Sequence, residues 1–337
     1  MKVLYAMQAT GNGHFSRARE IVPILQQYGD VDIAISGTQA DVKLPFPIRY
    51  KQRGTSFIYG NRGQINWLNT LSKTRFLTMV RDIWNFPVQD YDIIFNDFEP
   101  VTAWACRQKN IPCIGLSHQG AFLSNRTPRP KQRQFSGELV LKNYAPVTSM
   151  YAFHFQRYDK FIRTPVIRSE IRQATVSQGQ HISVYLPAVD EKLLVQRLQK
   201  IKSVQWHIFS KRVTAVQTIG HITIQPIDNE NWIQSVASSL GVMMSAGFEG
   251  PSEALFLGKK LIVMPIIGQY EQLCNATALE RMGIPVFRKI RHGFDSLIKD
   301  WIYEQPPVQV DYPDETAQVI QSILENEIGF SNVQVAL

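Results

Sequence analysis

The sequence predicts an α/β protein made of two halves, each built on a largely parallel sheet. Along the chain, short apolar segments typical of buried strands alternate with segments of helical periodicity, and this alternation favours parallel sheets. Each half also places a glycine-rich turn directly after an apolar strand, at residues 11–13 and 247–250. The length of 337 residues suits two domains of ordinary size better than one hydrophobic core.

The first half is expected to form a domain over residues 1–160 that opens as a nucleotide-binding-like βαβ unit. Its first helix should be capped by Ser16 and kinked by Pro23. Strands are predicted at 2–7 and 31–35, within 51–65, and at 92–95, 111–117 and 147–155, and helices at 67–84 and 100–108.

The second half is expected to repeat this plan as a domain over residues 161–312. The linker between the halves is placed at 157–172, because that segment has no clear period and contains a proline. A final amphipathic helix is predicted over 314–328, within a C-terminal segment 313–337, and Asp314 can cap it. Strands are predicted at 181–186, 205–209, 221–225, 242–245 and 261–264, and helices at 191–200, 231–239, 252–257 and 270–281.

The composition is typical of a globular protein, with 44% hydrophobic and 19% charged residues. No apolar run approaches the roughly 20 residues that cross a bilayer, and the N-terminal residues have too short an apolar core for a signal peptide. The three cysteines, Cys106, Cys113 and Cys274, show no metal-ligand spacing, so we expect buried thiols and a cytoplasmic location. The net charge of +8 suits an anionic partner, either a nucleotide sugar or an acidic membrane surface.

The stretch 245–283 combines the features of a phosphate-binding site. A buried strand ends at Ser245, a glycine turn follows, and a short helix opens with Pro251, whose missing N–H costs nothing in a first turn. The free N–H groups and the dipole at such a helix N-terminus favour negative charge. Glu253 lies one turn into this helix, where it can accept hydrogen bonds from a sugar hydroxyl. Beyond the next strand, three polar residues should face the same crevice: Glu271, Gln272 and Asn275.

The glycine turn of the first half does not fit a dinucleotide-binding fingerprint. After Gly11 and Gly13, that fingerprint requires glycine or alanine where this chain has Ser16. No acidic residue ends the second strand, at 35–37, to bind a ribose. A dehydrogenase is therefore not expected.

The spacing Gly247-x5-Glu253, an apolar strand ending in proline, and Glu271-Gln272-x2-Asn275 together resemble the donor-binding half of GT-B glycosyltransferases. The MurG-like and UDP-glycosyltransferase-like families are the most similar in pattern. The resemblance implies two Rossmann-like domains with parallel sheets facing a central cleft, and a last helix that crosses back to the N-terminal domain. In these families the first glutamate holds the ribose, the acidic residue and glutamine hold the sugar, and the glycine turn takes the diphosphate. The donor-binding residues expected here are Gly13, Ser245, Gly247, Phe248, Glu249, Gly250, Ser252, Glu253, Glu271, Gln272 and Asn275.

His14 is the candidate general base, since the strand-GxGH-xx-Arg pattern resembles the N-terminal loop of the same families, where the histidine has this role. A sugar hydroxyl is a poor nucleophile at neutral pH, and an imidazole is a suitable base for it. Asp97 or Glu99 should orient the imidazole, and spacing alone leaves both open. His118 is a competing base or, with Gln119, part of the acceptor site.

No metal ion or other cofactor is expected, because the donor half has no Asp-x-Asp pair and the chain has no His/Cys cluster. This agrees with the metal-independent, inverting habit of the resembled families, in which a UDP-sugar is the commonest donor. Ser245 departs from their pattern, since they carry a basic residue there that can touch phosphate. The backbone, or a cation among Arg17, Lys211 and Arg212, would then meet the diphosphate charge.

The segment 126–142 is strongly basic, and it is either a solvated loop or a patch that faces phosphate groups. It carries five cations against the single acid Glu138: Arg126, Arg129, Lys131, Arg133 and Lys142. Peripheral association with the inner face of a membrane is one expectation for it. Nucleic acid is not expected, because the aromatic interleaving of a single-strand binder is missing.

Two other functions share the expected architecture and stay open. A non-hydrolysing sugar-nucleotide 2-epimerase would also use histidine and carboxylates, but would need no acceptor. A non-catalytic GT-B relative could bind a sugar nucleotide as a partner protein, although such a protein has no use for a base at His14. The acceptor also stays open among lipid-linked, saccharide and small aromatic molecules.

Overall fold

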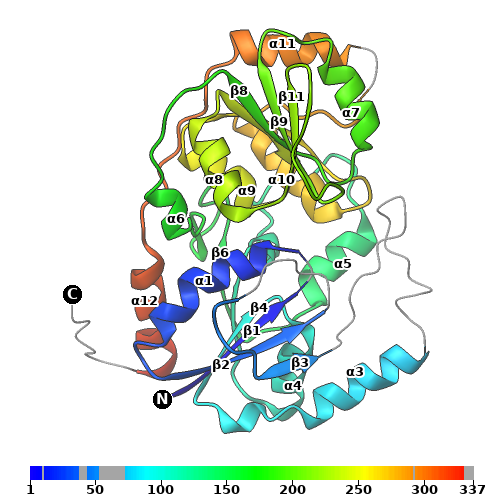
Figure 1. Ribbon diagram of the computed structural model, residues 1–337. Coiled ribbons are helices and arrows are strands. Elements are labelled where there is room, and N and C mark those ends of the chain that lie inside the picture. The colour runs from blue at the N-terminus through cyan, green and yellow to red at the C-terminus, as the bar shows by residue number, and fades with distance from the viewer. Residues whose placement is uncertain (10, 38–43, 53–72, 291–292, 330–337) are drawn as a thin grey trace.

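The computed structural model describes residues 1–9, 11–37, 44–52, 73–290 and 293–329. It consists of two α/β units stacked one above the other, with the first half of the chain forming the lower unit in Figure 1. Each unit contains one sheet, of seven strands in the first and six in the second. The described residues contain no helix long and apolar enough to cross a membrane.

The first sheet is parallel throughout, in the order β3-β2-β1-β4-β5-β6-β7. Strand order reverses between β1 and β4, and in such sheets the ligand crevice lies beyond the carboxyl ends of the strands at this point. The central strand β1 is buried from its second residue onward, as expected of a strand covered on both faces. The strands are β1 (Lys2–Gln8), β2 (Asp30–Ser36), β3 (Tyr50–Gln52), β4 (Ile93–Asp97), β5 (Ile114–Ser117), β6 (Ser149–Phe153) and β7 (Ile162–Arg163).

The second sheet has the order β10-β11-β9-β8-β12-β13, with only the β10–β11 pair antiparallel. Its order reverses between β8 and β12, which locates its ligand crevice beyond the carboxyl ends of these two strands. The strands are β8 (His181–Tyr185), β9 (Gln205–Ser210), β10 (Gln217–Ile219), β11 (Ile222–Pro226), β12 (Gly241–Ser245) and β13 (Lys260–Met264).

Helices connect the strands in both units. The first unit contains α1 (Gly13–Leu25), α3 (Lys73–Asn85), α4 (Pro100–Lys109) and α5 (Phe135–Asn143). Two short 3-10 turns precede β4 and follow β5, at Val88–Asp90 and Gln119–Leu123. The second unit contains α7 (Glu191–Leu198), α8 (Asn229–Ser238), α9 (Glu249–Phe256), α10 (Tyr270–Arg281) and α11 (Phe294–Glu304).

Two further helices, α6 (Ser169–Arg172) and α12 (Thr316–Ile328), join the units. The chain after α11 runs down one side of the molecule and brings α12 against α1 (Figure 1). Buried side chains of α12 belong to the same apolar cluster as Ile21 and Leu25 of α1. The same cluster continues into the second unit through Met244 and Phe248, so the core is shared across the junction.

Several expected details differ from the structure. Helix α1 begins at Gly13 with Asn12 as its cap position, so the expectation that Ser16 caps it is wrong, and Pro23 lies in its last turn. The cap position of α12 is Glu315, which makes no side-chain cap hydrogen bond, so Asp314 does not cap that helix.

Other elements were not predicted. Helix α5 occupies the end of the basic segment, and α6, β7, β10 and α11 are additional to the predicted set. Strand β7 belongs to the first sheet and lies just beyond the expected boundary at residue 160. The strand and loop expected within 51–65 fall largely on residues outside the described part of the chain. The helix expected at 67–84 is confirmed over its described part, where α3 spans Lys73–Asn85.

Candidate active site

A pocket of about 450 Å³ lies between the two units, at the carboxyl ends of their central strands. A second pocket of about 690 Å³ continues it over the second sheet and shares its lining at Gly13, Ser245 and Phe248. Ten of the predicted site residues line the first pocket: Gly13, His14, His118, Gln119, Ser245, Gly247, Phe248, Glu249, Glu271 and Gln272. Gly250 and Glu253 line the second, whereas Asp97, Glu99, Ser252 and Asn275 are buried behind the walls.

His14 and Asp97 form a buried pair at the wall of the first pocket. His14 lies in the first turn of α1 and Asp97 ends β4, and His14 Nδ1 is 3.0 Å from Asp97 Oδ1. His14 is 6% exposed and Asp97 is 0% exposed. In the tautomer that carries its proton on Nδ1, the imidazole donates to this carboxylate and keeps the Nε2 lone pair that a general base requires.

Arg17 completes this cluster and links the two units. Its Nε and Nη2 atoms lie 3.0 and 2.8 Å from the two carboxylate oxygens of Asp97, and Nη2 is also 3.2 Å from His14 Nδ1. Its third nitrogen, Nη1, is 2.5 Å from Glu249 Oε1, at the start of α9 in the second unit. Burial alone would lower the pKa of the Arg17 guanidinium, but the charges of Asp97 and Glu249 raise it.

The same arrangement keeps Asp97 ionised. Burial by itself would raise the pKa of Asp97, but the charges of Arg17 and His14 and their hydrogen bonds outweigh it and lower the pKa. Asp97 is therefore a carboxylate held between a permanent cation and an imidazole. Such a group can stabilise the imidazolium that forms when His14 takes a proton.

Glu99 has a different position and does not contact His14. Its carboxylate caps α4 by accepting from the backbone N–H groups of Val101 and Thr102, each at 2.7 Å, and it also accepts from the hydroxyls of Ser36 and Thr102. Burial raises its pKa, against the effect of these hydrogen bonds. Of the two carboxylates left open by the sequence, the structure brings Asp97 to the histidine.

The N-terminus of α9 forms the floor on the donor side. Glu249 is the first residue of this helix, and its carboxylate lies so close to Gly13 that a Cβ at Gly13 would be 2.2 Å from Oε2. The Ser252 hydroxyl is not directed to the pocket, since it donates to the Phe248 carbonyl at 2.8 Å. Lys211 lines both pockets, whereas Arg212 lines neither.

Glu253, the expected ribose ligand, forms a bidentate ion pair with Arg168 in the segment between the units. Arg168 Nε and Nη2 lie 2.5 and 2.9 Å from the two oxygens of Glu253. Burial raises the pKa of Glu253, and Arg168 opposes that rise. Nη1 of Arg168 continues the contacts to Asn229, at 2.7 Å, at the start of α8.

His118 lies at the junction of the units with both ring nitrogens engaged by the protein. Nδ1 is 2.9 Å from the carbonyl of Phe153, and Nε2 is 2.9 Å from the amide oxygen of Asn275. The ring is stacked on Phe248 with centroids 3.8 Å apart. Burial lowers the pKa of His118, and no ring nitrogen points to the pocket, which makes it a weaker base candidate than His14.

The start of α10 supplies the remaining polar groups of the pocket. Glu271 accepts from the Gln119 amide at 3.2 Å, across the two units. Gln272 accepts from the Ile266 backbone N–H at 3.0 Å and donates to Gln269 at 2.8 Å, so its position is fixed by the turn before the helix.

Sequence reasoning missed the structural role of Arg17, which it considered only as a phosphate ligand, and it missed Arg168. The i, i+3 spacing of His14 and Arg17 could have indicated that they share one face of a helix. Arg168 lies in a segment without periodicity and had no such indication.

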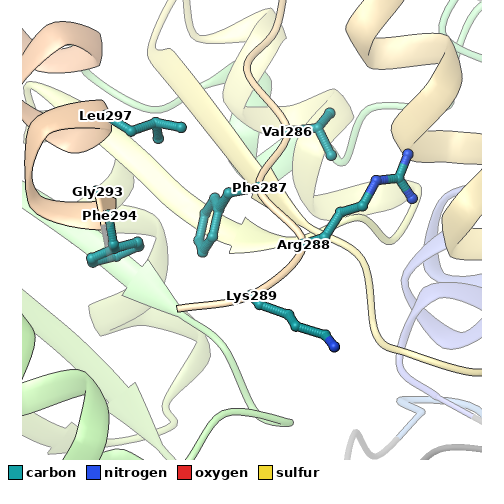
Figure 2. Close-up of a pocket in the computed structure, with 7 residues that line it drawn as sticks. All are labelled: Val286, Phe287, Arg288, Lys289, Gly293, Phe294 and Leu297. Atoms are coloured by element: carbon teal, nitrogen blue, oxygen red, sulfur yellow. The ribbon is translucent and has the colours of Figure 1, made fainter. Parts of the chain in front are cut away.

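A separate pocket of about 530 Å³ shares no lining residue with the two described above (Figure 2). It lies between the segment 286–289 and the start of α11, with the rings of Phe287 and Phe294 5.3 Å apart beside it. We assign this pocket no role.

Within the described residues, no group of three or more His, Cys, Asp and Glu side chains could hold a metal ion. The three cysteines are unpaired and buried. The expectation that the reaction needs no metal stays a prediction.

Comparisons with known proteins identify the fold and the family. The family model described as glycosyl transferase family 1 matches residues 1–306. No curated protein matches the sequence. Among solved structures, a UDP-glucosyltransferase from Polygonum tinctorium is similar, with 14% identity and a TM-score of 0.59 over 96% of this chain and 92% of that one.

Two further solved structures are similar over nearly their whole length. UGT89C1 from Arabidopsis thaliana, complexed with UDP-L-rhamnose, has 12% identity and a TM-score of 0.59 over 95% of this chain and 93% of that one. The spinosyn rhamnosyltransferase SpnG, complexed with thymidine diphosphate, has 13% identity and a TM-score of 0.54 over 96% and 100%. At this identity they establish the fold, which is GT-B. The family model spans most of the chain, and the protein therefore belongs to glycosyl transferase family 1 and is a glycosyltransferase.

Proposed function

We propose that this glycosyltransferase moves a sugar from a UDP-sugar to an acceptor hydroxyl, with inversion at the anomeric carbon and without a metal ion. Membership of the family supports transfer from a nucleotide sugar. The inversion, the identity of the base and the choice of UDP are our proposals. The observation that carries it is the His14–Asp97 pair, 3.0 Å apart and buried at the wall of the pocket between the units.

In the proposed mechanism His14 Nε2 accepts the proton of the acceptor hydroxyl as its oxygen attacks the anomeric carbon. The bond from that carbon to the diphosphate breaks on the opposite face, which inverts the configuration. Asp97 holds the Nδ1 proton and stabilises the imidazolium, and Arg17 holds Asp97 in place through its paired hydrogen bonds. General base catalysis of this kind contributes about 10²- to 10⁴-fold to the rate.

The departing diphosphate would lie at the N-terminus of α9, where backbone N–H groups and the helix dipole favour negative charge. Glu249 now lies there against Gly13, and its carboxylate would repel a diphosphate. We expect Glu249 to release its ion pair with Arg17 and turn toward solvent as the donor enters, because its side chain is 21% exposed. Lys211, which lines both pockets, is proposed to neutralise part of the phosphate charge in place of a basic residue at position 245.

Glu253, Glu271 and Gln272 are proposed to hold the ribose and the transferred sugar. Glu253 and Glu271 line adjoining pockets on either side of the α9 N-terminus, which matches a donor that extends across it. Arg168 fixes the Glu253 carboxylate from behind and keeps its charge balanced. Asn275 is completely buried and acts through His118 rather than on the donor.

The test combines donor binding with removal of the base. A thermal-shift screen of nucleotide sugars should show stabilisation by UDP-sugars, since a ligand that binds only the folded state raises its stability. His14→Ala should retain that shift while the transfer rate falls by about 10²- to 10⁴-fold. His221→Ala, which changes a histidine outside both pockets, is the control and should keep full activity. No thermal shift with any nucleotide sugar, or full activity of His14→Ala, would refute the proposal.

We also propose that the basic segment 126–142 binds to an anionic membrane surface. Arg129 is excluded from that surface, since it is buried and its Nε donates to Glu138 at 2.7 Å. The other four cations are exposed, and Phe135, 78% exposed on α5, lies among them in sequence. Co-sedimentation with phosphatidylserine vesicles should occur and should be lost in Phe135→Ser. Equal recovery with neutral phosphatidylcholine vesicles, or no binding to either, would refute it.

A further inference from the structure

Four side chains of the first unit line the pocket beside His14 without a role in the donor site. Gln8 ends β1, Phe98 directly follows β4, and Gln119 begins the 3-10 turn after β5. Tyr144 directly follows α5. All four line the same pocket as His14, and each lies at or just after the end of a strand or of α5.

Both glutamines have an amide oxygen that no group of the described residues satisfies. Gln8 and Gln119 are only 2% and 6% exposed. The Gln8 amide nitrogen donates to the Tyr144 hydroxyl at 3.2 Å, and the Gln119 amide nitrogen donates to Glu271 at 3.2 Å. Each amide oxygen is buried and has no hydrogen-bond partner among residues 1–9, 11–37, 44–52, 73–290 and 293–329. Buried polar atoms without partners are uncommon and costly, and a ligand that donates two hydrogen bonds would remove the cost.

Phe98 and Tyr144 form an apolar wall of the same pocket. Their ring centroids are 5.1 Å apart, with the planes tilted by 43°. Phe98 has φ of +57°, a left-handed backbone that an aromatic residue rarely adopts. Strained residues of this kind cluster at functional sites, where the surrounding structure holds a side chain in a required position.

We propose that the acceptor is a saccharide, an inference that rests on the proposed function. Its C–H face would lie against Phe98 and Tyr144, and two of its hydroxyls would donate to the amide oxygens of Gln8 and Gln119. A third hydroxyl loses its proton to His14 Nε2, its oxygen bonds to the anomeric carbon, and the nucleoside diphosphate leaves with the electrons of the broken C–O bond. A simple phenol has one hydroxyl, which the reaction consumes, and would leave both amide oxygens without donors.

The test compares acceptors that share one aromatic group. 4-Nitrophenyl glycosides of common hexoses and free 4-nitrophenol are offered with the donor that the thermal-shift screen selects, and products are identified by mass spectrometry. Transfer to at least one glycoside and not to 4-nitrophenol is expected. Saturation-transfer NMR with UDP present measures glycoside binding independently of turnover.

Variants connect the result to the named residues. Gln8→Met removes the amide and keeps the side-chain length, and it should raise the KM for the glycoside about fivefold to tenfold while the Kd of UDP is unchanged. Phe98→Gly should also raise that KM, and it relieves the backbone strain because glycine adopts a positive φ freely. Gln234→Met, on the exposed face of α8, is the matched control and should leave KM unchanged.

The outcomes separate the two proposals. If no nucleotide sugar binds, the proposed function fails. If 4-nitrophenol is glycosylated in preference to every glycoside, or if Gln8→Met leaves the glycoside KM unchanged, only the saccharide inference is overturned. Donor binding without any saturation transfer to a glycoside also overturns it.

Discussion

The replacement Asp97→Asn tests the assignment of the base most sharply, because it changes one oxygen for an amide nitrogen at a fully buried position. The carboxylate contacts His14 at 3.0 Å and binds Arg17 through both of its oxygens. Asparagine keeps the shape but has one acceptor oxygen and no charge. The imidazole of His14 would then lose the group that stabilises its protonated form.

The expected effect on catalysis is larger than the effect on stability. Loss of the orienting charge should lower kcat by about 10²- to 10⁴-fold, or about 3–5 kcal/mol in the activation barrier. Breaking a buried ion pair by removing one partner costs about 3–5 kcal/mol of stability. Here Arg17 keeps Glu249 at 2.5 Å as a second partner, so we expect a smaller loss of about 2 kcal/mol.

The matched control is Glu99→Gln, two residues along the same loop. Glu99 is equally buried but caps α4 and does not contact His14. Loss of a helix cap costs about 0.5–2 kcal/mol, so both variants should have a similar free energy of unfolding. Steady-state kinetics at saturating donor and denaturant unfolding are measured on both.

The expected result is a selective loss of kcat in Asp97→Asn, with Glu99→Gln close to wild type. Equal losses of kcat in both variants would show that the effect comes through stability or loop position. A normal kcat in Asp97→Asn, in protein shown to be folded, would refute the role of Asp97 and weaken that of His14.

Two other predictions concern the glycines Gly13 and Gly29 and the partly buried His207. Gly13→Ala places a methyl group against the end of the Glu249 side chain, so the free energy of unfolding should change by less than about 1 kcal/mol. Gly29→Ala should instead lose about 1–3 kcal/mol, because its Cβ would be 1.9 Å from the backbone oxygen of Met1. Burial lowers the pKa of His207 to about 4, with neighbouring histidine charge adding to the shift. Its stabilising effect is present above its ordinary pKa and is lost as the pH falls, because the unfolded chain takes up the proton first. After allowance for its partial exposure, about 1 kcal/mol should be lost between pH 7.5 and 5, measured by urea unfolding. His207→Phe should remove this part of the pH dependence, and a slope identical to wild type would contradict the account.

Sequence periodicity predicted the elements whose own residues carry the pattern. The helix at 270–281 has the bounds of α10, and the predicted strands of the second half match β8 to β13 within one or two residues, apart from β10. These elements are strands buried on both faces or helices with one apolar side. Their burial therefore produces an apolar run or a periodic apolar pattern in the sequence.

Elements whose order depends on distant partners could not be predicted in this way. Helix α5 lies in a basic, proline-rich segment, and its position depends on Tyr270, which donates to Glu138 at 2.6 Å across the units. No local pattern indicates this contact, because its two residues are 132 positions apart. The start of α1 is different, since it depends on a local contact in which the carbonyl of Asn12 accepts the first helical hydrogen bond from the N–H of Ser16.

The residues of the candidate site likewise divide into those that local spacing predicts and those that only the folded chain brings together. The glycine turn and Glu253 were predicted from spacing, since both lie on one strand–turn–helix unit. The choice between Asp97 and Glu99 required the sheet register that brings β4 beside β1, where Met7 pairs with Asp97. The partner of Glu253, Arg168, is 85 residues away in sequence and becomes visible only in the folded chain.

The most direct test of the account is the anomeric configuration of the product made from a ¹³C-labelled UDP-sugar, followed by NMR with and without a saccharide acceptor and in EDTA. We expect that the sugar is transferred only when the acceptor is present, that its configuration is inverted, and that EDTA does not change the rate. A product that retains the configuration of the donor, or an epimerised donor formed without any acceptor, would contradict the assignment of His14 as the base of an inverting transferase.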